Sequence, residues 1–400
     1  MEWLFLLLPV AAASGWWVGR RGAGGARSAE RGPGSAYFRG LNYLLNEQPD
    51  KAIDVFLELA EVDRETAETH LALGALFRRR GEVDRAIRIH QDLIARPKLT
   101  AQQRAFGLYE LGLDYMRAGL LDRAESLFKE LAEMQMQVQP ALRALIDIYQ
   151  QEKDWQRCLE TARQLEAAGE VPLRAEIAQF HCELAEQHLR EQDNRAARRH
   201  LQDAQRAAPD CIRASLLQAE MDMADGDAKS ALALYARVTE RGPRFVPAML
   251  PGLLDCYRRL GYERVAGELG QLFQAQPSPP LMLELSEALE REQGIDAAVS
   301  FLVDYLRGHA DLSAAERLLD LRVRQQRQEG GTADPTAEIV LGVVAHLLSA
   351  RPAYQCEHCG FEARALHWQC PSCKHWGSIM AVEPDRLVTD VAPLRQRRIT

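Results

Sequence analysis

The chain has 400 residues, of which 47% are hydrophobic and 26% charged, and its formal net charge is -8. This is the composition of an ordinary globular protein, which excludes a disordered chain and a protein with many membrane spans. Residues 1–39 carry a net +3 and residues 351–400 a net +2, which leaves -13 for the middle and argues against nucleic acid as the main partner.

An uncharged apolar segment opens the chain at residues 3–19 and is followed at once by Arg20 and Arg21. As a helix it would be about 25 Å long, short for a bilayer core but within the range that spans one. Positive charge after the segment predicts a membrane anchor at 1–20 with the rest of the chain in the cytoplasm. A cleaved secretory signal, the alternative, needs its positive charge before the apolar run. Residues 21–36 are Gly, Ser and Arg rich, which predicts a flexible basic linker.

Residues 37–350 are predicted to form an array of tetratricopeptide repeats that ends in capping helices. Small residues recur at intervals of 32 to 39 residues, around the 34-residue period of such repeats. These small-residue positions are Ala52, Ala86, Ala124, Cys158, Ala197, Ala231, Ala266 and Ala298. Repeats at 40–60, 74–94 and 112–132 match the pattern well, and the others are degenerate. We expect the helical pair Leu312–Gln328 and Asp334–Ser349 to cap the array.

The repeat region shows no sequence motif of catalysis, neither a phosphate loop nor a metalloprotease or serine-hydrolase signature. Single cysteines in helices indicate small buried residues, and these are Cys158, Cys182, Cys211 and Cys256. Histidines in the helices are interpreted as packing or surface residues, namely His70, His90, His181, His188 and His200. Repeat arrays of this kind bind proteins or peptides on a concave surface. We therefore expect a recognition protein and not an enzyme.

Two C-x-x-C pairs lie near the end of the chain, Cys356 with Cys359 and Cys370 with Cys373, and ten residues separate them. Each pair directs two thiolates at one ion, and two pairs complete a tetrahedral four-sulfur site. Four protein ligands leave no open position, so we expect one structural metal ion. Zinc is favoured over iron, although four-thiolate geometry serves both. The regular spacing argues against two disulfides or unused thiols, and a full cysteine set needs no ligand from His358, His367 or His375.

Four segments carry a family resemblance: LFLLLPVAAASGWWVGRR (4–21), LFRRRGEVDRAIRIHQ (76–91), DYMRAGLLDRAE (114–125) and the C-terminal YQCEHCGF…WQCPSCKHW. Over these segments, and nearly end to end, the chain resembles the lipopolysaccharide assembly protein B family of Gram-negative bacteria. The resemblance implies an all-α protein, a tetratricopeptide-repeat solenoid with an N-terminal transmembrane helix. It also implies a small rubredoxin-like four-cysteine metal knuckle domain, at 351–380 in this chain. The tail at 381–400 departs from the family pattern, and we expect it to be disordered.

The same resemblance implies a regulatory function at the bacterial inner membrane. Members of the family act as adaptors that promote proteolysis of the LpxC deacetylase by the membrane protease FtsH, and they are linked to an inner-membrane regulator that senses lipopolysaccharide. Two alternatives stay open: a scaffold for lipopolysaccharide synthesis and transport proteins without a role in proteolysis, and a redox protein with iron in its four-cysteine site. Because only Arg351, Pro352 and Ala353 link the last helix to the metal domain, we expect that domain to pack back on the repeats.

Overall fold

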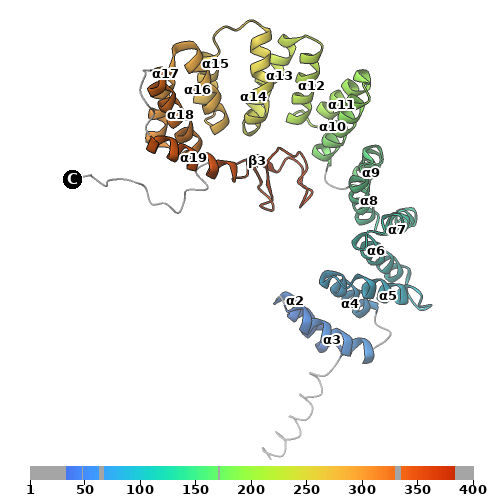
Figure 1. Ribbon diagram of the computed structural model, residues 1–400. Coiled ribbons are helices and arrows are strands. Elements are labelled where there is room, and N and C mark those ends of the chain that lie inside the picture. The colour runs from blue at the N-terminus through green and yellow to red at the C-terminus, as the bar shows by residue number, and fades with distance from the viewer. Residues whose placement is uncertain (1–32, 47, 63–66, 170–171, 329–334, 383–400) are drawn as a thin grey trace, which may run out of the picture. The chain divides into compact units, whose positions relative to one another are not determined.

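The computed structural model of the chain describes residues 33–46, 48–62, 67–169, 172–328 and 335–382 (Figure 1). The expected membrane anchor at 1–20, residues 21–32 of the expected linker and the tail from 383 onward lie outside these residues. The last four residues of that linker, 33–36, are helical and begin α2 instead of forming flexible chain. Among the residues described, none of the helices combines the length and the apolar character that a membrane crossing requires. The chain divides into two compact units, Met1–Pro172 and Leu173–Thr400, and each is described by itself.

The described part of the first unit consists of helices that pack in consecutive pairs. They are α2 (Pro33–Leu45), α3 (Pro49–Val62), α4 (Ala67–Arg80), α5 (Val83–Ile94), α6 (Ala101–Arg117), α7 (Leu121–Glu133), α8 (Val138–Glu152) and α9 (Trp155–Ala167). Gly81 and Gly119 form the turns inside two pairs with positive φ angles of 86° and 75°, a conformation that glycine adopts without steric cost. Thr100 and Gln103 begin α6 with a reciprocal capping box.

The second unit continues the helical pairs and ends in a small antiparallel sheet of order β2-β1-β3. Its helices are α10 (Arg174–Arg190), α11 (Asn194–Ala207), α12 (Ile212–Ala224), α13 (Ala228–Arg241), the 3-10 turn η2 (Pro243–Phe245), α14 (Val246–Arg259), α15 (Ala266–Ala275), α16 (Pro279–Gln293), α17 (Ile295–Gly308), α18 (Leu312–Gln328) and α19 (Pro335–Ser349). Its strands are β1 (Tyr354–Cys356), β2 (Glu362–Ala363) and β3 (Ile379–Ala381). The sheet adds a β element to the predicted all-α class.

The small-residue positions of the sequence pattern all lie in the core. Ala52, Ala86, Ala124, Cys158, Ala197, Ala231 and Ala298 have no exposed surface, and Ala266 is 5% exposed. Glycines on the first helices make room for large side chains of the second: a Cβ atom on Gly40 would lie 2.7 Å from the Phe56 ring, and one on Gly112 2.6 Å from the Phe128 ring. Small residues of one helix thus pack against large side chains of its partner, as close packing between paired helices requires.

This close packing predicts opposite outcomes for two Gly→Ala substitutions. Gly112→Ala should lower the free energy of unfolding by about 1–3 kcal/mol, because the new methyl group overpacks against Phe128. Gly267→Ala is the matched control: a Cβ atom there meets nothing within 4 Å, and alanine is the better helix former, so stability should hold or rise. Urea unfolding of both variants measures the difference, and equal stability of the two would contradict the packing.

A buried ionic network joins α4, α5 and α6 in the first unit. The Asp114 carboxylate has no exposed side-chain surface, and its Oδ2 lies 2.5 Å from Nδ1 of His90, which is also fully buried. Its other oxygen accepts a hydrogen bond from Arg78 Nη1 at 2.7 Å, and Arg78 Nη2 pairs with Glu110 at 2.6 Å. His90, expected to be a packing or surface residue, is buried and makes both packing and polar contacts: its ring fills the space beside Gly74, and its Nδ1 contacts the Asp114 carboxylate.

The last helix, α19, differs from the polar cap that ends a typical repeat array. None of its residues is buried, and four of its large apolar side chains are exposed: Ile339, Val340, Val343 and Leu347. The expected final helical pair is present, since α18 and α19 pack together. Its outer helix nevertheless lacks the polar face that a capping role requires.

Candidate metal centre

Two turns of the same design carry the four cysteines. In the first, the Cys356 N–H donates to the Phe361 carbonyl at 2.8 Å, and the Gly360 N–H donates back to the Cys356 carbonyl at 2.9 Å. In the second, the Cys370 N–H donates to the His375 carbonyl, and the Lys374 N–H donates back to the Cys370 carbonyl. Gly360 and Lys374 both have positive φ angles, 76° and 62°. Each turn thereby brings its two cysteine side chains to one side.

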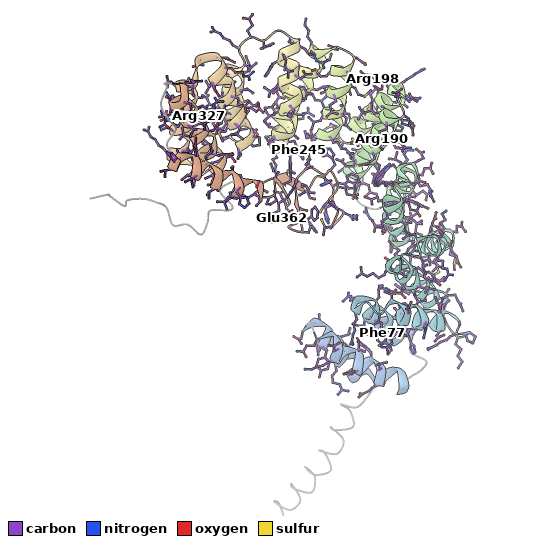
Figure 2. The ribbon with its side chains drawn as sticks, viewed as in Figure 1. Phe77, Arg190, Arg198, Phe245, Arg327 and Glu362 are labelled. Carbon is purple, nitrogen blue, oxygen red and sulfur yellow. The ribbon has the colours of Figure 1, made fainter. Side chains whose placement is uncertain are left out.

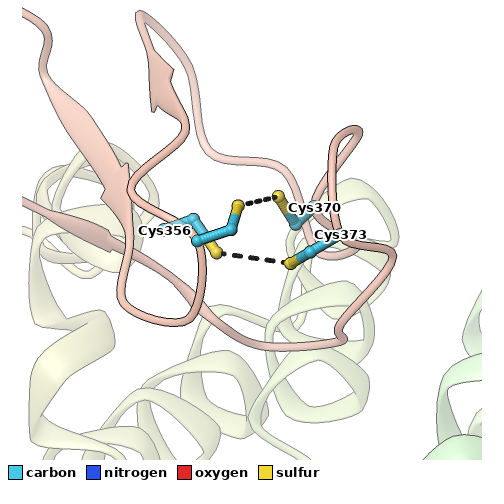
Figure 3. Close-up of side chains that lie close together, drawn as sticks. Cys356, Cys370 and Cys373 are labelled. Atoms are coloured by element: carbon cyan, nitrogen blue, oxygen red, sulfur yellow. Dashed lines mark hydrogen bonds between the residues drawn. The ribbon is translucent and has the colours of Figure 1, made fainter. Parts of the chain in front are cut away.

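The turns bring together the four sulfur atoms that the sequence analysis singles out (Figure 3). The Sγ atoms of Cys356 and Cys373 are 3.7 Å apart, and so are those of Cys359 and Cys370. All four Sγ atoms lie within 4.8 Å of one another. A disulfide would need about 2.05 Å, so these separations exclude the alternative of two disulfides in this structure.

The sulfur positions fit one tetrahedral ion. Ligands at the usual metal–sulfur distance of about 2.3 Å define tetrahedron edges of about 3.8 Å, close to the 3.7 Å observed. His358 and His375 stack beside the site, and with Cys373 they form a second possible ligand group. The four-sulfur set is complete without them. It matches the donors that zinc or iron–sulfur sites use.

Hydrogen bonds at the turns stabilise thiolates. Burial alone raises the pKa of the Cys356 thiol, but its hydrogen bonds with the Ser378 hydroxyl and with backbone N–H groups outweigh burial and lower that pKa to about 6. The backbone N–H of Phe361 lowers the pKa of Cys359. Burial raises the pKa of Cys373 to about 12. The turns therefore favour charged sulfur in part of the cluster, and an ion would supply the remaining stabilisation.

The four-cysteine module (residues 354–381) packs on the helices of its own unit, as its short link predicts. Phe245 lies in η2 and is labelled in Figure 2. The Trp368 ring stacks on it with ring centroids 5.3 Å apart. Trp376 meets Phe180 of α10 edge-on at 6.2 Å. Arg213 of α12 lies 5.8 Å and 5.9 Å from the two tryptophan rings. An ion pair between Arg244 and Glu357 adds a polar contact at the edge.

Arg213 is a residue that the sequence analysis missed. Its side chain is only 2% exposed and pairs with Glu183 at 2.8 Å and Glu186 at 2.6 Å, both on α10. The two carboxylates hold the guanidinium group beneath the tryptophans of the module. An arginine in the second position of α12 gives little sign of this arrangement in the sequence, because both of its carboxylate partners lie in another helix, α10.

Comparison with known proteins agrees with both parts of the chain. The rubredoxin metal binding domain family matches residues 354–381, and the tetratricopeptide repeat family matches 39–98 and 182–244. The chain is 38% identical over 384 residues to lipopolysaccharide assembly protein B of Escherichia coli (strain K12), an alignment that covers 96% of this chain and 98% of that protein. It is 34% identical over 395 residues to the protein of the same name from Haemophilus influenzae, with the same shares covered.

Proposed function

The chain belongs to the lipopolysaccharide assembly protein B family, and from that premise we propose that it regulates lipopolysaccharide biosynthesis as a membrane-anchored cytoplasmic adaptor. The observation that carries the proposal is the likeness over 96% of the chain, which includes both the repeats and the four-cysteine module. The adaptor would promote proteolysis of the LpxC deacetylase by FtsH and respond to the inner-membrane regulator that senses lipopolysaccharide.

The fold supports a role in binding. Tetratricopeptide repeats present the surfaces of their first helices to proteins and peptides. The four-cysteine module adds its own surface, because Phe180, Arg213 and Phe245 hold it against the helices. A partner that contacts both parts would meet one composite surface.

We further propose that Cys356, Cys359, Cys370 and Cys373 bind one structural metal ion, zinc in preference to iron. Four protein ligands leave no open position for a reaction at the ion. When bound, the ion supplies folding free energy to the module. The metal content and visible spectrum of the purified chain decide between zinc and iron. A redox-active iron would favour the alternative that the chain is a redox protein that carries an electron.

The half-life of the LpxC deacetylase tests the adaptor function. In cells that lack this protein the deacetylase should persist after protein synthesis is stopped, and the full chain should restore its rapid loss. A chain without residues 1–20, at the same level, should restore it poorly. A shared membrane raises the effective concentration of adaptor and protease, and tethering of this kind is worth about 10²–10⁴-fold in binding.

The scaffold alternative predicts a different result from the same cells. A scaffold would leave the deacetylase half-life unchanged and alter only the assembly of synthesis and transport proteins. An unchanged half-life in the deletion strain would therefore reject the adaptor and favour the scaffold. Full rescue by the chain without residues 1–20 would reject the membrane anchor as a requirement.

A further inference from the structure

Helices α10 and α11 bring together three potential metal ligands far from the four cysteines in the sequence. His181 on α10 and His200 on α11 face each other, with their Nδ1 atoms 3.1 Å apart. Asp203 lies one turn after His200 on the same helix. One ligand atom from each of the three residues lies within 4.8 Å of the other two. We call this group the histidine cluster.

The geometry of the histidine cluster suits a divalent transition metal. Imidazole nitrogens bind zinc at about 2.0–2.1 Å, so two of them on a tetrahedral ion are about 3.3 Å apart, close to the 3.1 Å observed. Two imidazoles and one carboxylate are ligands that such metals accept. A His–His hydrogen bond would also explain the short distance. The observation that favours a metal is the third ligand, an Asp203 oxygen within 4.8 Å of a ligand nitrogen of each histidine.

The surroundings of His200 favour its neutral imidazole, the form that binds a metal. Burial and the neighbouring His188 lower the pKa of His200, and Arg199 adds to the effect, while Asp203 opposes it. The His188 ring stacks on His200 at 5.3 Å. His188 Nδ1 is buried and makes no hydrogen bond, although a Glu191 carboxylate oxygen lies 3.4 Å away. Arg206 donates a hydrogen bond to Asp203 Oδ1. A bound metal ion would therefore share the Asp203 carboxylate with the Arg206 guanidinium group.

We propose that His181, His200 and Asp203 form a second metal site, which takes a divalent transition-metal ion such as zinc and is separate from the four-cysteine site. Three protein ligands leave one position for water. The ion would cross-link α10 to α11. His181 directly follows Phe180, whose ring contacts Trp376, so the site lies one residue from the contact between the helices and the four-cysteine module. This proposal goes beyond the adaptor function and does not depend on it.

Cobalt binding tests the proposal on the purified full chain. The four-cysteine site is first loaded with one equivalent of zinc per chain, which the four thiolates take in preference to the histidine cluster. Cobalt binds more weakly than zinc in the general order of divalent metals, so it should not displace zinc from the thiolates. We expect one further equivalent of cobalt per chain. Its spectrum should lack thiolate charge-transfer bands, because nitrogen and oxygen are the ligands.

Three variants decide whether the histidine cluster holds that ion. His200→Leu and Asp203→Asn should each lose the further equivalent, and His309→Gln, a change at an exposed histidine elsewhere in the unit, should retain it. Asp203 has a 39% exposed side chain, so its variant should keep the melting temperature of the metal-free fold even if His200→Leu lowers it. Addition of cobalt should raise the melting temperature of wild type and His309→Gln only.

Three results would overturn the proposal. The first is no further equivalent in wild type with the four-cysteine site occupied. The second is retention of the equivalent in Asp203→Asn. The third is its loss in His309→Gln, which would indicate nonspecific binding to surface histidines.

Discussion

Replacement of Cys370 by serine should remove the structural metal ion from the chain and unfold the four-cysteine module. The loss of folding free energy is on the order of 10 kcal/mol, the contribution of structural zinc in modules of this size. The module has little core of its own: the buried residues of its hydrophobic cluster are Cys356, Cys370 and Ile379, and two of these are proposed ligands. A core this small does not fold alone.

Metal analysis and limited proteolysis measure the effect. Cys370→Ser should contain one equivalent of metal less than the wild-type chain and be cut between residues 354 and 381, while the helices resist. A strong chelator should produce the same cleavage in the wild-type chain. Cys158→Ala, a change at a buried cysteine of α9, is the matched control and should keep its metal and its resistance. If Cys370→Ser kept full metal content and resistance, the four-cysteine site would be wrong.

The sequence was sufficient to predict the repeats because their packing imposes a fixed spacing. Where paired helices approach closely, only a small residue fits, and Ala52, Ala86 and Ala124 are fully buried as that rule requires. The cysteine pairs are predictable for a similar reason, since one turn must place two sulfurs on one ion. In both cases a local geometric requirement leaves a regular trace in the sequence.

Individual side-chain contacts between helices leave no such regular pattern in the sequence. His181 and His200 have Nδ1 atoms 3.1 Å apart, and Cys182 and Cys211 have Sγ atoms 3.8 Å apart, yet sequence analysis assigns all four to packing or surface. Their meeting depends on how each helix is rotated about its axis, which the sum of many core contacts decides. The spacing of His200 and Asp203, one helical turn apart, was the one local hint of a ligand pair. The exposed apolar face of α19 was missed because its composition resembles that of a buried helix.

Replacement of Asp114 by alanine should lower the stability of the first unit by about 3–5 kcal/mol, the cost of removing one partner from a buried ion pair. The substitution leaves His90 fully buried without its carboxylate and removes one of the two acceptors of Arg78. Glu110 still pairs with Arg78, so His90 is the residue that mainly loses its hydrogen-bond partner. Asp114→Asn keeps a hydrogen-bond acceptor and loses the charge, and its cost should be smaller.

Hydrogen exchange of the backbone amides in α4, α5 and α6 is the appropriate measurement, because it reports the stability of this region without assuming that both units unfold together. Asp50→Ala is the matched control: Asp50 pairs with Arg80 at 3.0 Å, but its side chain is 78% exposed, and a surface pair contributes about 1 kcal/mol or less. The buried network stabilises the unit only if protection in Asp114→Ala falls well below that in Asp50→Ala. Equal protection in the two variants would mean that His90 and Arg78 find water or other partners when the carboxylate is removed.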